Sequence, residues 1–211
     1  MPASDLHSFA DQIIDLPKGK LVTLKTYLSM PVGDDSADIP LPDGYALQRL
    51  GASDHARYRA LFAKVGENWL LFSRLLLKDA ALEKVLSQPH CHAHALTYGG
   101  EDIGLFELQH QTGPQDHPET ETDLAFLGLA MAARGRGLGT CLVRKAQHLA
   151  RLKRAQRLTI NTCQLDDPRA LGFYQRMGFR VEKLALEILT DPRHLGLYPK
   201  ESAPHIALCP L

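Results

Sequence analysis

The sequence predicts an α/β (α+β) fold, in which a mixed, largely antiparallel central sheet is flanked by helices on both faces. Two observations predict it. Strand patterns first run as a meander, and strands then alternate with helical patterns. The expected core order is strand, two helices, three strands, helix, strand, helix, strand. At 211 residues the chain can form one well-buried domain. We expect this domain over residues 44–211, after an N-terminal extension, residues 1–43, that contains an extra edge strand.

The extension contains one strand pattern. Apolar and polar residues alternate between Leu21 and Met30, which predicts a strand with one polar face. A turn-rich connector follows. The core then begins with a short strand, Tyr45 to Leu50, and a helix that starts after Ser53 and ends at Gly66.

The next part of the chain predicts a helix and a hairpin. A second helical region is expected from about Leu70, kinked near Asp79 and ended by Pro89. The hairpin strands are expected at residues 92–98 and 103–110, joined by a turn that contains two glycines.

A strand over Leu124 to Leu129 leads into a glycine-rich turn and then a helix. The apolar residues of the helix recur at helical spacing. Three glycines in the turn, at positions 135, 137 and 139, leave consecutive backbone N–H groups uncovered at the helix start. Such a turn is a site for an anionic phosphate.

A similar unit follows. The strand Leu158 to Cys163 precedes a helix for which Asp167 is the expected N-cap, with Pro168 at the first helical position. Gly178 is placed to end this helix in a left-handed conformation. The last strands are expected at residues 179–189 and 205–209.

The spacing of the glycines limits which ligand the turn can hold. A Walker loop requires Gly-Lys-Ser/Thr, but Gly139 is followed by Thr140 and Cys141. A dinucleotide fingerprint requires G-x-G-x-x-G, whereas this turn has G-x-G-x-G. The remaining pattern is R-x-x-G-x-G, Arg134 to Gly139. It resembles the pyrophosphate-binding motif of the GCN5-related N-acetyltransferases (GNAT), and the downstream Tyr-x-x-x-Gly-Phe, Tyr174 to Phe179, resembles the second motif of that family.

The resemblance covers about residues 44–190 and implies acetyl-CoA as cosubstrate, bound where the fourth and fifth core strands splay apart. The residues expected to bind it are Leu129, Met131, Arg134, Gly135, Arg136, Gly137, Leu138, Gly139, Thr140, Asn161 and Asp167. The family often has Asn at the position of Asp167, so this residue departs from the pattern.

The resemblance also implies catalytic residues. Tyr174 lies where the family places the general acid that protonates the departing thiolate. Asp123, eleven residues before Arg134, lies where the family commonly carries a glutamate that acts as general base. Glu107 is the alternative, because the hairpin pattern puts it among apolar residues such as Ile103 and Leu105. A solvated carboxylate without a role is the plain alternative for both.

The segment 66–74 carries the only tryptophan and falls where the family places its acceptor pocket. Trp69, Phe72 and Arg74 are therefore candidates for substrate binding, with simple packing as the alternative for Trp69. The expected acceptor is the amine of a small molecule or a peptide.

Composition excludes several classes of partner. The 24 basic residues balance the 24 acidic ones, so no overall charge favours nucleic acid or an anionic membrane. The four cysteines lack ligand spacing and are expected to be reduced thiols of a cytoplasmic protein. His90, His92 and His94 alternate, but without a nearby carboxylate they do not predict a metal site. A homodimer is possible.

Two other functions remain open at this point. One is a non-catalytic acyl-CoA-binding module with the same fold. The other, which the glycine spacing disfavours, is a nucleotide-binding protein of another fold.

Overall fold

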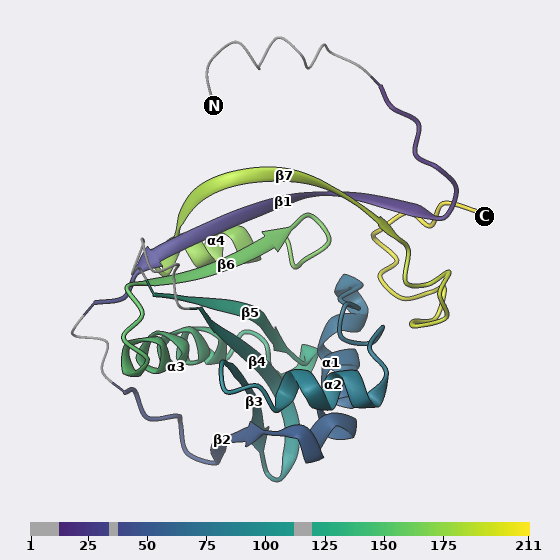
Figure 1. Ribbon diagram of the computed structural model, residues 1–211. Coiled ribbons are helices and arrows are strands. Elements are labelled where there is room, and N and C mark those ends of the chain that lie inside the picture. Colours follow the sequence, from purple (N-terminus) through teal and green to yellow (C-terminus); the bar gives the residue numbers. More distant parts are fainter. Residues whose placement is uncertain (1–12, 34–37, 112–119) are drawn as a thin grey trace, which may run out of the picture.

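The computed structural model describes residues 13–33, 38–111 and 120–211. Its strands form one sheet (Figure 1) and are β1 (Lys20–Pro31), β2 (Tyr45–Leu50), β3 (Cys91–Tyr98), β4 (Glu101–Gln111), β5 (Glu121–Leu129), β6 (Arg157–Cys163) and β7 (Arg180–Thr190). The α-helices are α1 (His55–Gly66), α2 (Asp79–Leu86), α3 (Leu138–Leu152) and α4 (Ala170–Arg176). Short 3-10 turns cover Ala52–Asp54 (η2), Glu67–Trp69 (η3) and Met131–Ala133 (η4). The predicted fold class is confirmed.

The strand order in the sheet is β2-β3-β4-β5-β6-β1-β7. Every neighbouring pair is antiparallel except β5 and β6, which are parallel. The β5–β6 pairing covers three positions and ends at Asp123 opposite Thr159. Beyond this point the two strands diverge, as the family resemblance implied, and the edge of β5 from Leu124 onward faces a gap.

The helices bury two apolar clusters on opposite faces of the sheet. Leu105 of β4 packs with α1 and α2, whereas its neighbour Phe106 packs with α3 and α4. Successive side chains of a strand point to opposite faces, so the alternation separates the two clusters. Both faces of the central strands are therefore covered.

The predicted position of the N-terminal strand is wrong. The strand exists, but β1 lies between β6 and β7, so it is not an edge strand. Its expected polar face is also incorrect, because Thr23 and Ser29 are buried while Val22 is exposed. The burial of the β1 side chains depends on strands pairing on both sides and on packing by other segments. An alternating sequence pattern predicts neither of these.

Three other expectations about elements need correction. The segment 70–78 is irregular instead of helical, because Leu70 adopts a left-handed backbone (φ 52°) and Arg59 binds the carbonyls of Leu75 and Leu77 at 3.2 and 2.7 Å. The segment 205–209 is not a strand. The helix α4 begins at Ala170, later than the predicted cap.

Edge strand β7 leaves apolar side chains uncovered. Leu184, Leu186 and Ile188 are all more than half exposed. Within the residues described, no helix combines the length and the apolar character needed to cross a membrane.

Candidate active site

A cavity of about 860 Å³ opens where β5 and β6 diverge. Its walls come from the glycine turn before α3, from α4, from the segment 69–74 and from the outer ends of β1 and β7. The splayed strands leave backbone groups of β5 without a strand partner on this side, so the cavity has polar edges as well as apolar walls. This volume is typical of a small-molecule site.

The glycine turn forms one end of the cavity. Gly135 and Gly137 both have φ of 75°, which is the left-handed conformation that glycine adopts without strain. The N–H groups of residues 135–140 donate to no carbonyl in the part of the chain that the structure describes. A Cβ on either glycine would meet no atom within 4 Å, so these amides face open space. The turn therefore has the uncovered amides that the glycine spacing predicts.

Arg134 braces this turn. Its Nε donates to the carbonyl of Leu129 at 3.1 Å, and its Nη1 binds the carboxylate of Asp167 at 3.0 Å. Asp167 also accepts from the Arg169 backbone N–H at 2.9 Å, two residues along, so it holds the start of α4 without being its N-cap. The hydrogen bond from the Arg169 side chain lowers the pKa of Asp167 to about 2, because it and the nearby positive charges outweigh the opposite effect of burial. The ion pair therefore persists at neutral pH.

Tyr174 lies on α4 and lines the cavity. Its ring packs against Phe173 and Phe179, with centroid distances of 5.2 and 5.8 Å. Burial raises the pKa of the Tyr174 phenol above its ordinary value, and the nearby Asp166 adds to the shift. The hydroxyl stays protonated at neutral pH, as a general acid requires.

Asp123 is at the fork of the two strands and lines the cavity. Its Oδ1 accepts a hydrogen bond from Thr159 at 2.9 Å. Burial raises its pKa, which the Thr159 bond partly offsets. A carboxylate with a raised pKa, held at the cavity wall, suits a general base.

Glu107 is held differently from what its sequence context suggested. Its neighbours are polar. Tyr58 donates to Oε2 at 2.5 Å, while Arg74 and Gln109 donate to Oε1 at 2.5 and 2.6 Å. The side chain is fully buried, and it is absent from the cavity wall. The expectation of apolar surroundings is wrong, because Arg74 reaches Glu107 from a segment that the hairpin pattern does not include.

The three candidate acceptor residues all line the cavity. The guanidinium of Arg134 lies 4.7 Å from the centroid of the Trp69 ring, and Arg74 lies 5.0 Å from that of Phe126. Phe72 belongs to the apolar cluster beside them. The candidate acceptor wall and the candidate cofactor turn are therefore in direct contact.

The remaining candidates divide into two groups. Leu129, Asn161, Gly139 and Thr140 line the cavity. The other group does not line it: Met131 and Arg136 are exposed, and Leu138 is buried in the core.

Sequence reasoning missed the part of the wall that β1 and β7 contribute. Lys25 of β1 and Glu187 of β7 form an ion pair at 3.0 Å on the cavity wall. Asp166, beside the predicted cap, also lines the cavity and accepts from Thr162 at 2.7 Å. Only the acidic run at 166–167 signalled Asp166, and nothing local signalled the pairing of β1 with β7.

The histidines form an aromatic cluster away from this cavity. His92 packs edge-on against His110 at 4.5 Å, and His94 stacks on Phe106 at 4.7 Å. Within the described ranges, no group of three or more His, Cys, Asp or Glu side chains is arranged to hold a metal ion.

Comparison with known proteins identifies a family and a relative. The model of the acetyltransferase (GNAT) family matches residues 58–179. A 5-NmdU N-acetyltransferase of Pseudomonas phage PaMx11 is 41% identical over 88 residues, which are 42% of this chain and 56% of that relative. The chain thus aligns with little more than half of the length of this relative.

Solved structures share the fold. An aminoglycoside acetyltransferase from an uncultured soil metagenomic sample superposes with a TM-score of 0.59 at 22% identity, covering 67% of this chain and 95% of that one. An aminoglycoside N-acetyltransferase in complex with CoA superposes with a TM-score of 0.53 at 15% identity, covering 70% and 95%. At such identities the similarity concerns the fold alone.

Proposed function

Because the chain belongs to the acetyltransferase (GNAT) family, we propose that it transfers the acetyl group of acetyl-CoA to an amine, by direct attack of the amine on the thioester. One observation carries this proposal. The cavity in the β5–β6 fork has the uncovered amides of the glycine turn at one end and both Tyr174 and Asp123 on its walls. An anion site, an acid and a base thus share one space.

The residues present fit CoA. The N–H groups of residues 135–140 and the N-terminus of α3 would hold the pyrophosphate. The unpaired edge of β5 would hydrogen-bond the pantetheine amides, with Asn161 on the opposite wall. When bound, acetyl-CoA supplies the activated carbonyl, whose bond to sulfur is exchanged for a bond to nitrogen.

The chain supplies the proton transfers. Asp123 accepts a proton from the amine, directly or through one water, and its raised pKa brings it closer to working pH. Tyr174 holds a proton on Oη at the cavity wall, where a departing sulfur would receive it. Glu107 is assigned a positioning role, because its carboxylate is occupied by Arg74, Tyr58 and Gln109.

The acceptor is proposed to be the primary amine of a small molecule or peptide. Four carboxylates line the cavity, and two of them, Asp167 and Glu187, are paired with Arg134 and Lys25. The other two, Asp123 and Asp166, form no ion pair in the described part of the chain, so they favour a cationic group. The names of the similar proteins support a small acceptor, since two are aminoglycoside acetyltransferases and one is named as a 5-NmdU N-acetyltransferase. A homodimer and a cytoplasmic location stay predictions.

The test is incubation of the purified protein with acetyl-CoA and a panel of primary amines, with release of the CoA thiol as readout. We expect release that depends on the amine and is reduced in Tyr174→Phe. Binding of CoA without release by any amine would favour the acyl-CoA-binding module. A melting shift with ATP or NAD but none with CoA would refute both.

A further inference from the structure

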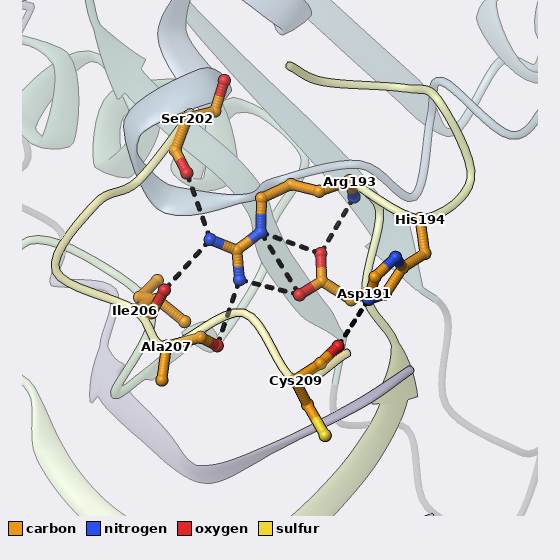
Figure 2. Close-up of polar contacts among 7 residues, drawn as sticks. All are labelled: Asp191, Arg193, His194, Ser202, Ile206, Ala207 and Cys209. Carbon is orange, nitrogen blue, oxygen red and sulfur yellow. Dashed lines mark hydrogen bonds and ion pairs between the residues drawn. The ribbon is translucent and has the colours of Figure 1, made fainter. Parts of the chain in front are cut away.

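Residues 191–211 form a C-terminal segment whose conformation is stabilised by a buried ion pair between two of its own residues. The side chains of Asp191 and Arg193 are each 1% exposed, and they pair through two nitrogens at 3.0 and 2.7 Å. Figure 2 shows that the same guanidinium also donates to three carbonyls, those of Ser202, Ile206 and Ala207, at 3.0 to 3.2 Å. The segment contains no helix or strand, so Arg193 supplies bonds that a regular element would otherwise provide.

The held segment packs against the loop that carries the acceptor wall. Tyr198 donates to the carbonyl of Leu71 at 2.6 Å, and Ser202 donates to the carboxylate of Glu67 at 2.9 Å. The His205 ring lies 5.5 Å from the Trp69 ring, edge to face. Three contacts therefore join residues 198–205 to residues 67–71.

The backbone of this loop depends on outside support. Leu70 has φ of 52°, a left-handed conformation that is unfavourable for a non-glycine residue. It is 2% exposed, and it shares an apolar cluster with Tyr198 and Ala203 of the C-terminal segment. Such strain persists only where the surroundings enforce it.

Trp69 has no hydrogen bond of its own to fix its ring. Its Nε1 is buried, and in the described part of the chain it has no acceptor. Its ring lies against the ring of His205 and against the guanidinium of Arg134, which braces the glycine turn. The orientation of Trp69 thus depends on packing from the C-terminal segment.

We propose that Arg193 is a positioning residue: it fixes the conformation of the C-terminal segment, whose residues 198–205 contact the loop 67–72, and thereby fixes Trp69 as the wall between the glycine turn and the acceptor end of the cavity. The inference rests on the proposed function for the identity of the two ends of the cavity. The segment lies beyond residues 58–179, the part that the family model matches. The acceptor wall is therefore shaped by a part of the chain outside that match.

Trp69 is the only tryptophan, so its fluorescence reports the wall directly without acetyl transfer. We compare the emission maximum and acrylamide quenching of three proteins: Arg193→Met, Tyr198→Phe, and the control Arg57→Met. The control breaks the Arg57–Asp102 ion pair, 2.7 Å long, between α1 and β4. We expect quenching to rise at least about twofold in the first two variants and to stay at the wild-type value in the control, because a ring that loses its packing becomes more accessible.

Arg193→Met leaves the buried Asp191 carboxylate without its ion-pair partner. If this variant does not fold, Tyr198→Phe decides, since it removes one hydrogen bond only. If Arg193→Met folds and its Trp69 quenching is unchanged, the proposal is overturned. If Arg193→Met is unfolded, unchanged quenching in Tyr198→Phe overturns it. Arg193→Lys should restore part of the wild-type signal.

The Kd for CoA should stay within about threefold of the wild-type value in Tyr198→Phe, because the amides of the glycine turn are untouched. If Trp69 quenching rises in the variants but no amine releases thiol from the wild-type protein, the proposed function fails and the positioning role stands. If the wild-type protein releases thiol but quenching does not change in the variants, the positioning role fails and the proposed function stands.

Discussion

Replacing Glu107 by Gln tests whether this buried carboxylate is structural or catalytic. Wild-type Glu107 accepts hydrogen bonds at 2.5 to 2.6 Å from Tyr58, Arg74 Nη2 and Gln109, and a longer one at 3.4 Å from Arg74 Nε. A glutamine keeps the shape but has one acceptor oxygen, and its NH₂ group would face donors. We therefore expect a less stable protein whose chemistry still uses its base.

The magnitude follows from burial. Removing one partner of a buried ion pair costs about 3–5 kcal/mol, because the other charge is left unpaired. The Arg74 side chain is 19% exposed and lines the cavity, so water can offset part of this cost. We expect a loss of about 2–4 kcal/mol. For a chain of this length that corresponds to a fall in Tm of about 4–16 °C.

The assay combines thermal unfolding with the pH profile of kcat/KM. Asp102→Asn is the matched control for stability, since it weakens an ion pair with Arg57 whose side chains are 36% and 22% exposed. Such a pair is worth about 1 kcal/mol or less. Asp123→Asn is the control for chemistry, and it should lose the acidic limb of the profile, which Glu107→Gln should retain.

Two results would contradict these expectations. If Glu107→Gln melts within about 2 °C of the wild-type protein and loses the acidic limb, Glu107 is the base and its hydrogen bonds contribute little. If neither Glu107→Gln nor Asp123→Asn alters that limb, the amine arrives neutral and the enzyme supplies no base.

Three further predictions concern the glycine turn, the acid and the histidine cluster. Gly137→Val should abolish CoA binding in calorimetry because a side chain would cover the amides, whereas Gly99→Val, at a hairpin glycine that also has positive φ and open surroundings, should bind CoA normally; equal affinity in both would contradict the anion site. Tyr174→Phe should lower kcat by about a hundredfold or more while the Kd for acetyl-CoA is unchanged, and a loss below about threefold would mean that the thiolate leaves unassisted. Burial lowers the pKa of three histidines to about 4, whereas their pKa in the unfolded chain is about 6.5. Their contribution to stability is therefore fully present above about pH 6.5 and is lost as pH falls toward 4. The Tm should fall across this range, and less so in His94→Leu; a Tm that does not change with pH would contradict this prediction. These histidines are His92, His94 and His110.

The sequence alone determined the features that depend on local backbone chemistry. The spacing of Gly135 and Gly137 predicted a turn with exposed amides, and both have positive φ. Gly178 was predicted to end α4 in a left-handed conformation, and its φ is 101°. Residues without a Cβ adopt such conformations at low cost, so the chemistry of a single position was sufficient.

The tertiary structure decided which distant segments meet. A period of two residues predicted the strand β1, but its place between β6 and β7 depends on which edges pair, and the period does not encode that. The same holds for Glu107, whose partner Arg74 comes from the loop after α1, and for Trp69, which lies between Arg134 and His205 from remote parts of the chain. Charge pairing and ring packing act through space, so the surroundings of a residue follow only once the sheet order is fixed.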